Sequence, residues 1–497
     1  MEREELLLSR LIEYGKSTAY PFHMPGHKRQ VQEAWPGCFP NPFSVDITEI
    51  DGFDNLHHAE GILKQSMEWA AKVYGADKTY YLVNGSSGGI LSAICAVTRS
   101  GGTLLMSRNC HKSVYHGVIL NQLEAEYVYP QIMSDLGIQG GIRAEDVENA
   151  LEQNPGIQAV LIVSPTYDGV VSDVRRIAEI VHEKGIPLIV DEAHGAHFPF
   201  GGTDFPESAI ACGADLIIQS LHKTLPSLTQ TAVLHMRTGL VDEKRLERYL
   251  QMFQSSSPSY VFMAGMEACI YEMEQHGRQR MQAFAVLLRE VRKQLFGLRH
   301  LRLLGAECIG ASGVYDLDRS KLVVSCRGCV IGTRKENRLG LTGEAFGDWL
   351  RKDYQLEMEM CGADYVVAIA TAWDSPEGLG RLADALLAID ARLELEGGLE
   401  SGAENSQSCG QPDIRWKLAD AVEAECEALP LTACAGRISG EFIYLYPPGI
   451  PIVAPGEVVT EAVIRQVQYY RDQGLPVQGM ADNRAEMLNV VMVRRET

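Results

Sequence analysis

The sequence lacks any long hydrophobic run. No stretch approaches the roughly 18 uninterrupted apolar residues that a membrane-spanning helix needs, and the start, MEREELLLSRLIEYGKS, does not resemble a secretory signal. Positive charge is also in short supply, because 45 Lys and Arg residues against 65 Asp and Glu residues leave a net charge of −20. Such a surface repels phosphate backbones. We therefore expect a cytoplasmic protein that binds neither membrane nor nucleic acid.

Cysteines paired at metal-binding spacing are scarce as well. The 12 cysteines are scattered over 497 residues and stand mostly in apolar contexts, as reduced thiols do in cytosolic proteins. Cys326 and Cys329 form a close pair, but no second pair follows at zinc-site spacing, and we expect no metal. The sequence has no internal repeat, and its 46% hydrophobic and 22% charged residues are typical of a globular protein.

One break in the apolar pattern divides the chain. Residues 395–413, LEGGLESGAENSQSCGQPD, have the composition of a flexible linker. The length favours about three domains. We expect an N-terminal segment (1–60), a large domain (61–300), a small α+β domain (301–394) and, after the linker, a C-terminal domain (414–497).

Between about residues 75 and 235, short β-branched runs alternate with helical stretches. The runs are TYYLV, GTLLMS, QAVLIVS, PLIVDE and DLIIQS. Residues 173–184 between two of them have apolar residues at helical spacing, with Asp173 as N-cap and Gly185 as the stop. Strands that are apolar on both faces and joined by helices predict an α/β fold with a mainly parallel sheet. Ligands of such sheets gather beyond the carboxyl ends of the strands.

Polar residues follow four of these runs. The turn Asn84–Gly89 opens a helix, where free N–H groups suit an anion such as phosphate. Asp191 ends a buried strand, where a carboxylate needs a cationic partner. Lys223 follows another strand, and burial there would lower its pKa and give the neutral amine that carbonyl chemistry needs. His111 adds an imidazole near the same edge.

Each of these features also has a plainer interpretation. A Gly/Ser turn is a common helix cap, and Asp191 could cap a helix or belong to a buried ion pair. His194 and His197 could suggest a metal site, and with His57 and His58 a metal hydrolase, but no third ligand stands nearby at the right spacing.

Lys112 is the rival of Lys223. It precedes a helical stretch, so we expect it at the surface.

The four strand ends together match what pyridoxal 5′-phosphate requires. Its phosphate needs an anion cup, and its aldehyde needs a lysine. Its ring nitrogen needs a carboxylate, and its face needs a flat partner. We therefore predict pyridoxal phosphate as cofactor.

Eight segments resemble the Orn/Lys/Arg decarboxylase family of fold type I, in the short form typified by bacterial arginine decarboxylases. The match keeps the same order over nearly the whole chain; longer members carry a receiver-like domain ahead of the PGHK segment. The resemblance implies an aminotransferase-like large domain with a mainly parallel sheet, a smaller α+β domain and a C-terminal decarboxylase domain. The segments are PFHMPGHKR (21–29), DITEIDGFDNLHHAEG (46–61), NCHKSVYHG (109–117), SPTYDGV (164–170), VDEAHGAH (190–197), SLHKTLPSLTQ (220–230), SSPSY (256–260) and YPPGIPIVAPGE (446–457).

The resemblance also implies roles for individual residues. Lys223 would hold the cofactor covalently, Asp191 would pair with the pyridinium nitrogen, and His111 would stack on the ring. Ala193 would pack beneath the ring and His194 would lie close to it. The phosphate would be held by Ser86, Ser87, Ser220 and His222. The family's cup usually reads Gly-Thr-Ser, and the serine at position 86 keeps the hydroxyl.

Three further expectations come from the resemblance. Ser256 and Ser257 would reach the phosphate of a neighbouring subunit, since family members are at least dimers. Glu441 would lie near the site and contact substrate. The segment 326–343 is longer and more polar than the family pattern, and we expect an exposed loop there.

The function implied is α-decarboxylation of a basic L-amino acid to its amine and CO₂. Arginine or lysine is favoured over ornithine, and the proton for Cα would come from His111, His194 or Lys223. The protein would be a cytoplasmic homodimer or larger homo-oligomer in polyamine biosynthesis. An aminotransferase or aldolase on the same scaffold, or a non-catalytic regulatory paralogue, stays open as an alternative.

Overall fold

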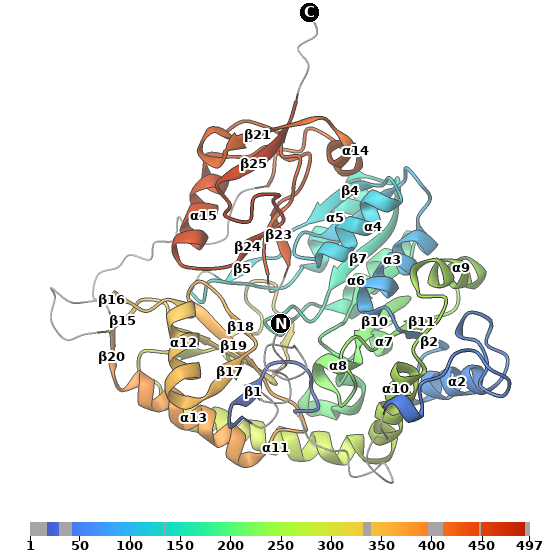
Figure 1. Ribbon diagram of the computed structural model, residues 1–497, viewed down its shortest axis with the longest axis horizontal. Helices are drawn as coiled ribbons and strands as arrows, with labels where there is room; N and C mark the ends of the chain where they lie inside the picture. Colours follow the sequence, from blue (N-terminus) through green and yellow to red (C-terminus); the bar gives the residue numbers. More distant parts are fainter. Residues whose placement is uncertain are drawn as a thin grey trace, which may run out of the picture.

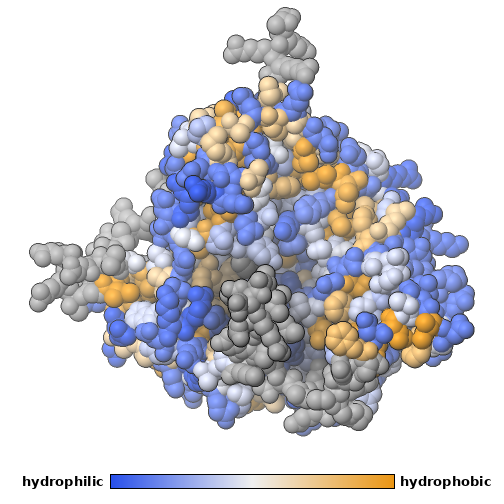
Figure 2. Space-filling model, in the orientation of Figure 1, coloured by the Kyte–Doolittle hydropathy of each residue, from blue (hydrophilic) through white to orange (hydrophobic). Residues whose placement is uncertain are grey.

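The fold has three parts (Figure 1). Residues of all three line one cavity. The computed structural model describes residues 17–28, 42–133, 135–331, 339–395, 411–446 and 449–492. No helix within these ranges is both long and apolar enough to cross a bilayer. Figure 2 shows hydrophilic residues over most of one face, with hydrophobic residues in separate small groups.

A seven-stranded sheet forms the largest part. Six strands run parallel and β11 runs antiparallel between two of them. Their spatial order is β2 (Lys78–Leu82), β11 (Ala232–Met236), β10 (Leu216–Ser220), β9 (Leu188–Asp191), β7 (Ile157–Val163), β3 (Thr103–Ser107) and β4 (Glu124–Val128). The five predicted strands are confirmed within a residue or two.

Helices cover both faces of this sheet because its strands are apolar on both sides. Ile217 of β10 packs with one layer, and its neighbours Leu216 and Ile218 pack with the other. One layer holds α3 (Gly85–Val97), α4 (Lys112–Leu120) and α9 (Glu243–Phe253). The other holds α5 (Ala144–Gln153), α6 (Val174–Glu183) and α7 (Ala209–Cys212). Helix α6 begins after Asp173, whose side chain accepts a hydrogen bond from Arg176 N as predicted.

A four-stranded antiparallel sheet forms the small domain. Its strand order is β12 (Arg302–Leu303), β14 (Lys321–Ser325), β19 (Tyr365–Ile369) and β18 (Met360–Cys361). One face packs with the helices α11 (Arg278–Leu295), α12 (Gly343–Tyr354) and α13 (Pro376–Asp390). The other face packs against Ile138 of β6 (Ile138–Gln139) and Val170 of β8 (Val170–Val171). The small domain is thereby held close to the carboxyl ends of the large sheet.

The expectation of an exposed loop over 326–343 is wrong at its described ends. Cys326 and Cys329 are buried, and β15 (Cys329–Ile331) pairs with β16 (Leu339–Gly340) and with β20 (Leu393–Leu395). The segment is polar on average, but Cys326, Cys329, Val330 and Leu341 near its two ends are buried. Residues 332–338 lie outside the described residues.

The C-terminal domain sits against the carboxyl edge of the large sheet (Figure 1). The predicted runs EFIYLY and IPIVAP contain β22 (Ile443–Leu445) and β23 (Ile450–Val453), which pair with each other. The domain also holds β21 (Cys426–Pro430), β24 (Val477–Gln478), β25 (Met487–Val491), α14 (Leu418–Glu423) and α15 (Glu461–Asp472). Residues 396–410 of the expected linker lie outside the described residues, and the domain boundaries stay predictions.

A buried lysine ties the N-terminal PGHK segment to the small domain. Strand β1 (Tyr20–Phe22) pairs in parallel with β17 (Leu356–Met358). Lys28 Nζ donates to three carbonyl oxygens, those of Pro21, His23 and Ile369, at 3.0, 3.2 and 2.7 Å. It also lies 4.0 Å from Asp374 Oδ2.

Replacing Lys28 with methionine is expected to lower the free energy of unfolding by ~3–5 kcal/mol, because it leaves the buried Asp374 charge uncompensated. The denaturant midpoint of the holoenzyme measures this. Lys352→Met is the matched control: its amine pairs with Asp348 on an exposed face, where an ion pair contributes about 1 kcal/mol or less. Equal midpoints for the two variants would contradict the structural role of Lys28.

Candidate active site

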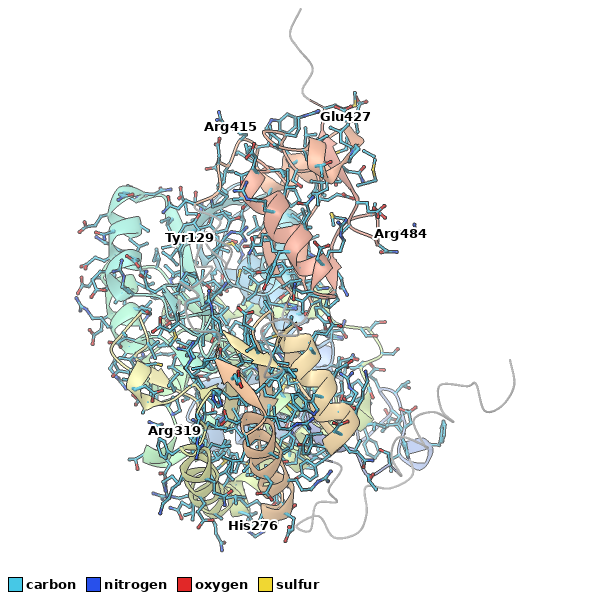
Figure 3. All side chains as sticks on the ribbon, turned by 90° about the vertical axis from the view of Figure 1, so that its left-hand side faces the viewer. Tyr129, His276, Arg319, Arg415, Glu427 and Arg484 are labelled. Atoms are coloured by element: carbon cyan, nitrogen blue, oxygen red, sulfur yellow. The ribbon has the colours of Figure 1, made fainter. Side chains whose placement is uncertain are left out.

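A cavity of about 1170 Å³ opens where the three parts meet. Its wall includes the strand ends of the large sheet, residues 359–363 of the small domain and residues 450–453 of the C-terminal domain. Figure 3 places Tyr129, one of the lining residues, near the level at which the C-terminal domain joins the large sheet.

Lys223 lies in the short helix α8 (Leu221–Thr224), directly after β10. Its Nζ atom is 3.0 Å from His194 Nε2. Burial lowers the pKa of Lys223 while the Asp191 carboxylate opposes that change, and burial also lowers the pKa of His194 far below its usual range. The neutral His194 ring therefore accepts a hydrogen bond from the Lys223 amine.

Asp191 is the last residue of β9 and is buried in the same cavity wall. Burial raises its pKa, and the positive charge of Lys223 and a hydrogen bond from Ala193 N (3.1 Å) oppose this. A carboxylate in this position is stabilised by a cation placed beside it. Ala193 follows within the same turn and also lines the cavity.

His111 precedes α4 and faces the cavity with a fixed ring. Its Nδ1 atom accepts hydrogen bonds from Ser113 N (3.2 Å) and Ser113 Oγ (2.8 Å). Burial, helped by Lys223 and Lys112, lowers its pKa to about 3, so the ring is neutral. The proton must then sit on Nε2, because Nδ1 is an acceptor.

Backbone N–H groups at the start of α3 form a cradle for an anion. The preceding residue, Asn84, gives its amide to Phe253 O instead, and no side chain in the described part of the chain caps the helix. Gly85 adopts φ 71°, which brings the chain into the helix at a sharp angle. Ser86 Oγ lies 2.5 Å from Ser220 Oγ across the cradle. Unpaired N–H groups and the positive end of the helix dipole favour a phosphate here.

His222 and Ser87 complete this side of the cavity. His222 Nδ1 donates to Thr231 O (2.9 Å), which leaves Nε2 for a ligand. Burial lowers the pKa of His222 to about 4, and an anion beside Nε2 would raise it again, because it stabilises the protonated ring.

The structure therefore brings together nine of the predicted residues. The residues that line this one cavity are Ser86, Ser87, His111, Asp191, Ala193, His194, Ser220, His222 and Lys223.

Other predicted residues lie elsewhere. Glu441 is absent from the described lining of the cavity, and its carboxylate accepts hydrogen bonds from Ala481 N and from Asn489. Ser256 and Ser257 are exposed in the loop before α10 (Tyr260–Glu272).

The histidines of the metal hypothesis lie apart, and Lys112 lies at the start of α4. His58 is exposed beside Glu60, whereas His194 is buried in the cavity, so the four histidines of the metal hypothesis are not brought together. Across the described ranges no set of three or more His, Cys, Asp or Glu is arranged as metal ligands. Lys112 begins α4 half-buried, with its Nζ 5.2 Å from the ring centroids of Tyr444 and Tyr446.

The cavity is also lined by Tyr167, Asp168 and Glu359, which were not predicted as site residues. Tyr167 packs against His194 with ring centroids 4.7 Å apart, and its hydroxyl donates to Glu359. Glu359 also accepts from Met24 N (2.8 Å). Asp168 follows Tyr167 directly. The segment SPTYDGV was visible as a strand end, but nothing in the sequence joins it to Glu359 of the small domain.

The residues present fit pyridoxal phosphate. The cavity combines an uncapped helix N-terminus, a buried amine and a buried carboxylate whose one described hydrogen bond comes from Ala193 N. The first suits the phosphate, the second an aldehyde and the third a protonated ring nitrogen.

Comparisons with known proteins point the same way. The family model for the Orn/Lys/Arg decarboxylase major domain matches residues 6–372, and the model for the C-terminal domain of the same family matches residues 413–474. The arginine decarboxylase of Bacillus subtilis is 34% identical over 497 residues, covering 99% of this chain and 98% of the relative. The arginine decarboxylase of Halalkalibacterium halodurans is 34% identical over 501 residues, covering 99% of each.

Solved structures agree in fold. The lysine decarboxylase LdcF of Francisella novicida superposes with a TM-score of 0.74 at 19% identity, covering 97% of this chain and 80% of that one. Lysine decarboxylase A of Pseudomonas aeruginosa gives 0.72 at 20% identity, covering 90% and 73%. The predicted fold class is confirmed: a mainly parallel α/β sheet with a smaller domain and a C-terminal domain.

Proposed function

The chain belongs to the Orn/Lys/Arg decarboxylase family. On that premise we propose that it removes the α-carboxyl group of L-arginine and that Lys223 holds the cofactor. Decarboxylation of a basic amino acid with pyridoxal phosphate is the chemistry of the family. Two full-length relatives named arginine decarboxylase support the choice of arginine. The observation that carries the proposal is that Lys223, Asp191 and the uncapped start of α3 share one cavity.

When bound, pyridoxal phosphate supplies an electron-accepting ring that takes up the electron pair left by departing CO₂. Asp191 would keep the ring nitrogen protonated, and its burial strengthens this interaction because no water competes. The N–H groups of α3, with Ser86 and Ser220, would hold the phosphate. Ala193 and His111 would lie against the two faces of the ring.

Lys223 and His194 would handle the proton that replaces CO₂. Burial lowers the pKa of the Lys223 amine, which favours its neutral, nucleophilic form. In its protonated form the same group, hydrogen-bonded to His194 Nε2, would donate the proton to Cα of the substrate. His111 Nε2–H is a second candidate donor in the same cavity.

Side-by-side kinetics test the proposal. The holoenzyme is incubated with arginine, lysine and ornithine, and CO₂, amine and keto acid are measured. We expect kcat/KM for arginine to exceed that for either other substrate by at least about tenfold, the discrimination that one misplaced methylene or charge gives. Keto acid in place of CO₂ would instead establish transamination. Lysine as the better substrate would overturn the choice of arginine and leave the reaction class intact.

We also propose that the protein is a cytoplasmic homodimer and that it supplies amines for polyamine biosynthesis. Ser256 and Ser257 support it, because they are exposed and free to reach a second copy of the chain. Light scattering of the holoenzyme at micromolar concentration measures the oligomeric state.

A further inference from the structure

The cavity must hold a substrate with a positive charge at its far end. A guanidinium or ammonium group buried in a cavity needs a carboxylate or several acceptors, since an unpaired buried cation is strongly destabilised. The described lining of the cavity contains four acidic side chains, which are Asp168, Asp191, Glu359 and Glu457.

Three of the four already have a partner or a role. Asp191 would pair with the ring nitrogen of the cofactor. Glu457 accepts on Oε2 from Arg108 Nη2 (3.1 Å) and from Ala454 N (2.9 Å), so Arg108 already balances its charge, although Oε1 has no hydrogen-bond partner among the described residues. Glu359 accepts one hydrogen bond on each oxygen, from Tyr167 and from Met24 N.

Asp168 differs from Glu457 because no Lys, Arg or His is paired with it in the described part of the chain. It is 8% exposed, and its Oδ1 atom has no hydrogen-bond partner among the described residues. The Tyr365 hydroxyl is its one side-chain hydrogen-bond donor in the part of the chain that is described. Burial raises the pKa of Asp168 to about 7, and a cation beside it would lower that pKa. A buried carboxylate with an unused oxygen that lines a cavity is suited to a cationic ligand.

Two contacts connect the neighbour of Asp168 to Lys223 at the reacting end of the cavity. His194 Nε2 lies 3.0 Å from Lys223 Nζ, and the Tyr167 ring packs against His194 at 4.7 Å between centroids. Asp168 is the next residue, and Gly169 (φ 90°) turns the chain sharply after it. A Cβ atom at this glycine would stand 2.7 Å from Lys321 Cγ, so the turn is closely fixed. Asp168 thus lines the same cavity next to the residue that packs against His194.

We propose that the Asp168 carboxylate binds the distal cation of the substrate and selects basic amino acids over neutral ones of equal length. The inference rests on the proposed function and names one specificity-determining residue for it. Tyr365 holds the carboxylate in place, and Oδ1, which has no hydrogen-bond partner among the described residues, is left for the substrate. A guanidinium presents N–H donors in a planar fork that suits a carboxylate.

The test compares arginine with citrulline, its neutral analogue of nearly the same shape. For the wild-type holoenzyme we expect kcat/KM to favour arginine by at least about 10²-fold, as in sites built around a polar substrate group. Asp168→Asn is expected to reduce this preference to about tenfold or less, chiefly through a higher KM for arginine, because it removes a charge and keeps the shape. Loss of folding alone would lower both rates and leave their ratio unchanged.

Asp168→Glu supplies a second readout that does not depend on the asparagine variant. It moves the carboxylate one methylene farther into the cavity, so ornithine, the shorter substrate, should gain at least about fivefold in kcat/KM relative to arginine. The matched control is Asp364→Asn, which makes the same charge change beside Tyr365 but outside the described cavity lining. It should leave both ratios within about twofold of the wild-type values.

The possible failures are distinguishable. A wild-type holoenzyme that releases no CO₂ from any basic amino acid overturns the proposed function. An active wild-type enzyme whose arginine-to-citrulline ratio survives Asp168→Asn overturns the inference alone. Glu359→Gln then identifies the remaining candidate: collapse of the ratio in that variant would assign the cation to Glu359.

Discussion

Replacing Lys223 with alanine is expected to abolish decarboxylation and covalent attachment of the cofactor together. Lys223 is the buried amine directly after β10, 3.0 Å from His194 Nε2, and in the proposed reaction it is both nucleophile and proton carrier. Loss of both roles should lower kcat by at least about 10⁴-fold, the upper end of what one positioned proton donor contributes. The variant should also lack the visible absorbance of lysine-bound pyridoxal phosphate.

Borohydride reduction followed by peptide mass mapping locates the attachment directly. In the wild-type protein the pyridoxyl label should sit on Lys223. Lys112→Ala is the matched control, because this lysine contacts Tyr444 and Tyr446 near the same edge but is half-buried at the start of α4. That variant should keep the label on Lys223. A label found on Lys112 in the wild-type protein would invalidate the whole assignment of the site.

The sequence predicted the large sheet well because its strands are buried on both faces. Runs such as QAVLIVS and DLIIQS carry no alternation, and the helices between them have clear caps such as Asp173. Strand β11 itself was not predicted. Residues 221–231 are too few for the helical crossover that two adjacent parallel strands require, so β11 must return antiparallel. That length argument was available in the sequence.

The site residues also fall into two groups, those that the sequence predicted and those that it could not. Residues at the strand ends were found because the carboxyl edge of a parallel sheet collects them, and Asp191, Lys223 and His111 meet there. Glu359 and Tyr167 could not be found so, because their contact joins two domains across 192 residues of sequence. The buried ends of 326–343 were missed because average polarity hides short apolar stretches such as Cys329–Ile331.

Asp191→Asn is expected to lower kcat strongly while the protein still binds pyridoxal phosphate. Asparagine keeps the shape of the side chain and its hydrogen bond to Ala193 N, but it has no charge to keep the ring nitrogen protonated. Removing one partner of a buried charge pair costs about 3–5 kcal/mol, which corresponds to roughly 10²- to 10⁴-fold in rate. KM should change far less than kcat, because the interaction matters most when the ring accepts electrons.

Glu192→Gln is the matched control for Asp191→Asn. Glu192 is the next residue and equally buried, but its carboxylate accepts from Gln219 Nε2 (2.6 Å) and Ala209 N (2.7 Å), away from the described cavity lining. Its replacement should lower the denaturation midpoint and leave kcat within about threefold, since a buried hydrogen-bond network contributes to stability and not to the reaction. If both variants lost the same stability and both kept kcat within about threefold of the wild-type value, Asp191 would be a structural carboxylate. The electron demand of the reaction would then have to be met without it.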